Sequence, residues 1–178
     1  MDAAEAPHDL LPPPAAARRF AGANVLVVGD VALDRATEGR LGAQDMFVVE
    51  AETARLGGAG EVVRHLVSLG VATAFISVVG DDPAGAELTG LVGAQRNVEP
   101  WLLVQGGRTT QQIDTYVAGG RAVMRVARQD QGAVHPKIAE RLVRIARAVR
   151  QDGRVGRGHG VAGDPHQPLG DLGMHRTL

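Results

Sequence analysis

Apolar residues in the first half of the chain gather in short runs, and polar and glycine-rich stretches separate them. Val25–Val28 is an uninterrupted apolar run and Thr73–Val79 is a largely apolar one, and each is followed by glycine and aspartate. Runs of this length are typical of strands that are buried on both faces of a sheet. Two further runs, Phe47–Glu52 with a more polar end and Trp101–Val104, also predict strands.

Helical patterns alternate with these strands. The glycines at Gly57–Gly60 precede a helix predicted over Glu61–Leu69, whose apolar residues recur at helical spacing. A second helix is predicted after Asp82, because aspartate is a favoured N-cap and Pro83 fits the first helical turn. Strands that alternate with helices indicate the α/β fold class.

The last patterned elements are a hairpin and an amphipathic helix. Ile113–Val117 and Ala122–Val126 flank the paired glycines Gly119-Gly120, which predicts a β-hairpin. Over Pro136–Arg150 the apolar residues recur at i, i+4, i+7 and i+11, which predicts a helix with one apolar stripe.

The two ends of the chain differ from this middle part. Residues 1–20 are rich in alanine and proline, and we expect a disordered leader there. Residues 151–178 are rich in glycine and carry no strand or helix period, which indicates a disordered tail or a stretch translated out of frame. The folded domain is therefore expected over residues 21–150.

Composition removes several classes of function. The formal net charge is −1, which argues against a strongly basic nucleic-acid binder, and the absence of cysteine excludes disulfides and thiolate metal sites. No apolar run reaches the roughly 18 residues of a membrane helix, and no signal-peptide pattern opens the chain. We expect a cytoplasmic protein that contacts neither nucleic acid nor membrane.

Two segments are candidates for ligand binding. Asp34 follows the strand end at Gly29-Asp30, and its carboxylate oxygens could accept hydrogen bonds from the hydroxyl groups of a sugar. Gly57-Gly58 would let a ligand approach the backbone where helical N–H groups are exposed. The alternatives are a plain turn with a helix cap at Asp34 and a tight strand-to-helix turn at the glycines. Neither segment matches a dinucleotide fingerprint or a P-loop.

Other possible sites are weaker. Gly80–Asp82 could hold a metal, but a capped turn explains it better. Val161–Asp164 resembles a glycine-rich anion hole with an aspartate, and we interpret it as a coincidence because no strand precedes it. No catalytic and no metal-binding residue is therefore assigned.

Taken in order, several segments resemble the N-terminal half of the PfkB (ribokinase-like) carbohydrate kinases. The nearest similarity is to the kinase domain that phosphorylates D-glycero-β-D-manno-heptose 7-phosphate. The segments are VLVVGDVALDR (Val25–Arg35), LGGAGE (Leu56–Glu61), SLGV (Ser68–Val71), VVGDDPAG (Val78–Gly85) and TYVAGGRAVMRVAR (Thr115–Arg128).

The resemblance implies a three-layer α/β/α fold with a small β lid over the sugar, with lid strands from residues near 43–56 and 101–128. It implies that Asp34, Gly57 and Gly58 contact a sugar or sugar phosphate, and that ATP with Mg²⁺ donates the phosphoryl group. Glu61 stands where the family has asparagine, so it is the fourth candidate contact. A homodimer through lid strands is also implied.

The chain departs from the family after Arg150, where no segment resembles the ATP-binding half or its catalytic aspartate. We therefore expect a truncated kinase domain that does not turn over ATP as an isolated chain and that lacks the segments with which the family binds ATP. One alternative is a non-catalytic sugar-binding or regulatory module. Another is a subunit whose missing half comes from a second polypeptide.

Overall fold

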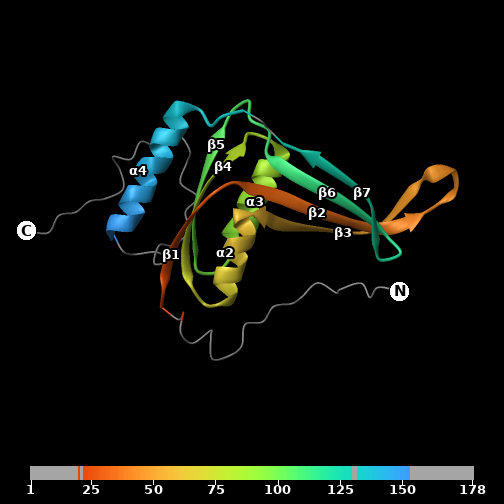
Figure 1. The fold of residues 1–178 in the computed structure, drawn as a ribbon, viewed down its shortest axis with the longest axis horizontal. Coiled ribbons are helices and arrows are strands. Elements are labelled where there is room, and N and C mark those ends of the chain that lie inside the picture. Colours follow the sequence, from red (N-terminus) through yellow and green to blue (C-terminus); the bar gives the residue numbers. More distant parts are fainter. Residues whose placement is uncertain (1–19, 21, 130–131, 153–178) are drawn as a thin grey trace, which may run out of the picture.

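The computed structural model describes residues 20, 22–129 and 132–152, which form two sheets and three α-helices (Figure 1). The strands are β1 (Asn24–Val28), β2 (Val31–Leu41), β3 (Phe47–Gly58), β4 (Ala72–Gly80), β5 (Val98–Gln105), β6 (Gln111–Ala118) and β7 (Arg121–Arg128). The helices are α2 (Ala59–Ser68), α3 (Pro83–Gly93) and α4 (Pro136–Asp152), with a 3₁₀ turn, η1, at Ala43–Asp45.

Three layers make up the core. The strands β1, β4 and β5 form a parallel sheet in the order β1-β4-β5. Phe75 and Val79 of β4 pack with side chains of α2 and α3, while Ala74 and Ile76 pack against α4 on the other face. The prediction of a strand buried on both faces is thus confirmed at β4, and the three-layer α/β fold is confirmed with it.

Helix α4 covers one face of the parallel sheet with the apolar stripe predicted from the sequence. Ile145 and Val149 are buried, and Ile138 and Leu142 pack against the same cluster. The arginines of this helix lie on its other faces, so one apolar face packs on the sheet, as is typical of a helix that covers one side of a core.

The second sheet, which we call the lid sheet, has the order β3-β2-β6-β7. It extends away from the core, and the β2–β3 hairpin lies at its far end (Figure 1). The hairpin predicted around Gly119 and Gly120 is present between β6 and β7, and both glycines have positive φ, of 57° and 75°. Such backbone conformations favour glycine and match the twist of a tight hairpin.

The structure corrects one alternative interpretation of the Asp34 segment and one detail of the expected lid. The segment after Gly29-Asp30 is the long strand β2 and not a turn with a helix cap, because it pairs along its length with both β3 and β6. Residues 101–105 belong to β5 in the parallel core sheet and not to the lid, since β5 pairs with the buried strand β4. The lid strands therefore come from residues 31–58 and 111–128.

The turn between β4 and α3 joins the core to the lid sheet. Asp82 caps α3, as predicted, by accepting a hydrogen bond of 2.8 Å from the Gly85 N–H. Its other carboxylate oxygen accepts one of 2.8 Å from the N–H of Thr110, the residue before β6, and the Thr110 hydroxyl accepts one from the Gly80 N–H. These bonds fix the position at which β6 leaves the core.

The expected leader lies outside the described residues apart from Phe20, and most of the expected tail lies outside them too, so these domain boundaries stay predictions. The same is true of the Val161–Asp164 segment. Within residues 20–152, as far as they are described, no helix combines the length and apolarity that crossing a membrane requires.

Candidate functional site

Asp34 lies directly over Gly57, where β2 and β3 approach the core. A Cβ placed on Gly57 would stand 2.5 Å from Oδ2 and 2.6 Å from Oδ1 of Asp34, so only glycine leaves room for this carboxylate. The strand register explains the contact, because Ala32 pairs with Gly57 and Asp34 follows two positions later on the same face. The two candidate segments of the sequence are therefore brought together.

The other two candidate residues flank this contact. Gly58 has φ 58° and ψ −132°, and a Cβ there would stand 2.7 Å from the carbonyl oxygen of Asp30. This conformation lets the chain turn from β3 into α2, whose first N–H, that of Ala59, donates to the same carbonyl at 2.9 Å. Glu61 lies exposed in the first turn of α2.

The electrostatic environment of Asp34 is unusual for a partly exposed carboxylate. Burial raises the pKa of Asp34 above its ordinary value, and the negative charge of Glu61 raises it further, while Arg55 and Arg125 act in the opposite direction. The Oδ1 atom is buried and accepts no hydrogen bond from the part of the chain that the structure describes. A buried acceptor without a donor is costly, so this oxygen is suited to a donor brought by a ligand.

Two arginines share the face of the lid sheet that carries Asp34. Arg55 pairs directly with Asp34 across β2 and β3. Arg125 on β7 lies on the same face, since Asp34 pairs with Ile113 on β6, which in turn pairs with Ala127, two positions from Arg125. Sequence reasoning missed both arginines, although the alternation of side chains along β3 would have placed Arg55 beside Gly57.

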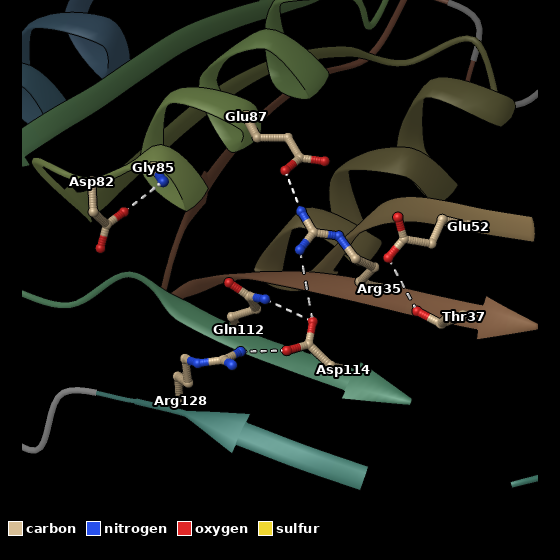
Figure 2. A network of polar contacts seen from close by, with 9 residues as sticks. All are labelled: Arg35, Thr37, Glu52, Asp82, Gly85, Glu87, Gln112, Asp114 and Arg128. Carbon is tan, nitrogen blue, oxygen red and sulfur yellow. Dashed lines mark hydrogen bonds and ion pairs between the residues drawn. The ribbon is translucent and has the colours of Figure 1, made fainter. Parts of the chain in front are cut away.

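The opposite face of the lid sheet carries an ionic network (Figure 2). Arg35 of β2 contacts Glu87 of α3 at 2.5 Å and Asp114 of β6 at 3.9 Å. Asp114 is 5% exposed and also accepts hydrogen bonds from Gln112, at 2.6 Å, and from Arg128. No pattern along the chain predicted this network, because its members come from four separate elements.

The described residues, 20 to 152 with their gaps, contain no group of three or more histidine, aspartate or glutamate side chains that could hold a metal ion. The carboxylate of Asp82 is engaged as a helix cap, so the capped-turn interpretation of Gly80–Asp82 is the one that fits. The structure therefore gives no support to the metal-site interpretation of Gly80–Asp82.

Comparison with known proteins gives the ancestry of the chain. No protein-family model matches it. The bifunctional protein HldE of Acidiphilium cryptum is 48% identical over 138 residues, which are 74% of this chain and 28% of that protein. The HldE of Paramagnetospirillum magneticum is 39% identical over 157 residues, or 83% of this chain and 32% of that protein.

A solved structure supports the fold. Phosphofructokinase-2 from Escherichia coli superposes with a TM-score of 0.54 at 19% identity, over 71% of this chain and 40% of that chain. With its three-layer core and its lid sheet, the chain belongs by fold and ancestry to the PfkB (ribokinase-like) carbohydrate kinases. Within this family it is related to the HldE proteins, and it spans about a third of the length of the curated relatives that it matches.

Proposed function

We propose that the face of the lid sheet around Asp34 and Gly57 is the sugar-binding part of a PfkB-type kinase. The single observation that carries this proposal is the buried Oδ1 of Asp34, which lacks a donor among the described residues and lies against a glycine. The hydroxyl groups of a polyol supply such donors, and the missing side chain at Gly57 leaves the room that the Asp34 carboxylate occupies. The resemblance of Val25–Arg35 and the segments after it to the heptose 7-phosphate kinase domain favours a heptose among sugars.

A sugar phosphate fits this face better than a neutral sugar. Arg55 and Arg125 are both exposed and act on the charge of Asp34 from its own face of the sheet. Guanidinium groups bind phosphate through paired hydrogen bonds. Glu61 would repel a phosphate, so we place the polyol beside Asp34 and Glu61 and the phosphate beside the two arginines.

Catalysis needs groups beyond these. Kinases of this family use ATP with Mg²⁺, and the described residues contain no group of three or more histidine, aspartate or glutamate side chains that could hold a metal ion. We propose that residues 1–178 by themselves bind the acceptor sugar and do not transfer a phosphoryl group. Phosphoryl transfer depends on positioned charges around the phosphates, and the chain matches about a third of each relative's length.

A complementing half, in the same or another polypeptide, has a place to dock. β1 lies at one edge of the core sheet, and no strand of the described residues pairs with its outer side. Val28 at the end of β1 is 56% exposed. Unpaired backbone groups beside an exposed apolar side chain favour the addition of a further strand. This observation keeps the partner-dependent subunit as the second candidate.

A homodimer through the lid stays part of the proposal. Several large apolar side chains of the lid sheet and its hairpin are exposed, and exposed apolar surface favours association. The exposed lid residues are Leu41, Met46, Val49, Val123 and Met124.

A cytoplasmic location of the protein stays a prediction as well.

Calorimetry of the purified chain with D-glycero-D-manno-heptose 7-phosphate tests the proposal. We expect saturable binding without ATP, its loss in Asp34→Ala, and a weakening of tenfold or more in Arg55→Ala. The control Glu140→Ala removes an exposed carboxylate from α4, in the opposite layer of the core, and should bind like the wild type. Binding that survives Asp34→Ala would contradict the proposed site. Phosphorylation of the sugar by the isolated chain would contradict the proposal that residues 1–178 bind the sugar without transferring a phosphoryl group.

A further inference from the structure

The lid sheet contacts the core in two ways beyond the chain connections and the Thr110 bonds. At its root, Leu33 and Leu56 are buried in the apolar cluster formed with α2, β4 and α3. Two positions farther along β2, on the same face as Leu33, Arg35 forms its ion pair with Glu87 of α3 (Figure 2). The apolar contact has no preferred direction, whereas a guanidinium–carboxylate pair does.

Arg35 joins one carboxylate of the core to one carboxylate of the lid. Asp114 is 5% exposed, and its other partners, Gln112 and Arg128, both belong to the lid sheet. Glu87 belongs to α3, which packs on the core. The Glu87–Arg35–Asp114 bridge therefore connects a residue held by the lid sheet, Asp114, to a residue on a helix of the core, Glu87.

We propose that Arg35 is a positioning residue which sets the orientation of the lid sheet on the core, and thereby the position of the adjacent Asp34. Since consecutive strand residues point to opposite faces, the bridge holds β2 from the side away from the ligand. A rotation of the lid sheet about this point would carry Gly57 along with Asp34 and would move the Asp34 carboxylate relative to Glu61 on α2 of the core. The consequence for ligand affinity rests on the proposed function, and the consequence for lid orientation does not.

The bridge is exposed enough that orientation, and not stability, should depend on it. The side chains of Arg35 and Glu87 are 28% and 37% exposed. Ion pairs with this access to water contribute little to the free energy of unfolding. If the bridge sets the orientation of the lid, breaking it should change the distance between lid and core and should hardly change the free energy of unfolding.

Electron spin–spin distance measurements test the orientation directly. The chain has no cysteine, so Val123→Cys on β7 and Val143→Cys on α4 give two unique labelling sites, and both valines are exposed. In this background we expect Glu87→Gln to shift or broaden the distance distribution. Arg35→Lys should do so partly, because one ammonium group cannot reproduce the guanidinium fork between two carboxylates.

The matched control is Glu50→Gln, which breaks the exposed Arg40–Glu50 pair of 3.4 Å within the β2–β3 hairpin. It should leave the distribution unchanged. In calorimetry, Glu87→Gln should weaken heptose 7-phosphate binding roughly fivefold or more, as a modest coupling between sites would, and Glu50→Gln should not.

The outcomes separate this proposal from the proposed function. An unchanged distribution in Glu87→Gln overturns the positioning role, and so does a variant that no longer folds, because the pair would then be a determinant of stability. If the wild-type chain binds no sugar phosphate, the proposed function fails, while the distance measurement still decides whether Arg35 orients the lid.

Discussion

The carboxylate of Asp34 occupies the space that a side chain at position 57 would need, with 2.5 Å between Oδ2 and the place of a Cβ on Gly57. Gly57→Ala must therefore displace Asp34 or shift β3. We expect heptose 7-phosphate binding to weaken at least tenfold and the free energy of unfolding to fall by about 1–3 kcal/mol, as overpacked sites do. Calorimetry and urea denaturation measure the two effects.

Gly90→Ala is the matched control for this change. Gly90 lies inside α3, and a Cβ there would meet nothing within 4 Å. Alanine in a helix restricts the unfolded chain more than glycine does, so this variant should be more stable by roughly 0.5–1 kcal/mol and should bind normally. Equal binding by Gly57→Ala and Gly90→Ala would mean that the contact between Asp34 and Gly57 has no role in ligand recognition.

The raised pKa of Asp34 predicts that this residue opposes folding at neutral pH. A carboxyl group whose pKa is higher in the folded state contributes stability below its unfolded value of 3.8, and this contribution is lost as the pH rises through the folded pKa. Asp34→Asn should therefore stabilise the chain on the order of 1 kcal/mol at pH 7. The gain should shrink as the pH falls toward 3.8, and ligand binding should be lost.

Glu61 supplies a check on the cause of that effect. Its charge is the second contribution to the raised pKa of Asp34, after burial. In a Glu61→Gln background the gain from Asp34→Asn at pH 7 should be smaller. Urea denaturation of the four proteins as a double-mutant cycle measures the difference. A gain of the same size in both backgrounds would show that the two carboxylates do not interact.

Asp82 should have the opposite pH dependence. Burial alone would raise the pKa of Asp82, but hydrogen bonds from Thr110 and from the Gly85 N–H outweigh it, and the pKa is lowered. The stability that this carboxylate contributes is thus complete above the unfolded value of 3.8 and is lost as the pH falls through the lower folded pKa.

Asp82→Asn should cost about 1–2 kcal/mol at pH 7, because an amide keeps one acceptor and loses the other. The cost should vanish in acid, as followed by thermal unfolding across pH. Asp81→Asn, at the exposed neighbouring position, should stay within about 0.5 kcal/mol of the wild type at every pH. If the loss in the free energy of unfolding caused by Asp82→Asn did not change with pH, Asp82 would not act as a charged helix cap.

Gly58→Ala tests the turn from β3 into α2. The positive φ of 58° with ψ −132° strains any other residue, and a Cβ would lie 2.7 Å from a backbone oxygen that cannot easily move. We expect a loss of about 3 kcal/mol in the free energy of unfolding. Gly70→Ala, which also has positive φ but meets nothing within 4 Å, should lose only about 1 kcal/mol. Similar losses at the two positions would mean that the close approach to Asp30 is unimportant.

The amino-acid pattern alone determined the local elements and the core. The apolar run at Thr73–Val79 predicted a doubly buried strand, and the stripe of α4 predicted which side chains face the sheet. Asp82 and the paired glycines Gly119-Gly120 were predicted in their roles as cap and hairpin turn. These features depend on residues close together in sequence, where steric preferences and side-chain periodicity act directly.

Only the tertiary structure decided which distant residues meet. The sequence did not place β2 as a central strand of the lid sheet, since its alternation of apolar and polar residues is interrupted by charges that find partners on α3 and β6. The strand register that places Arg55 and Arg125 beside Asp34 could not be predicted from the sequence, and neither could the ion pairs of Arg35. Strand pairing and ion pairs between separate elements depend on how the sheets and helices pack. Local patterns in the amino-acid sequence therefore do not predict them, although the sequence as a whole determines the fold.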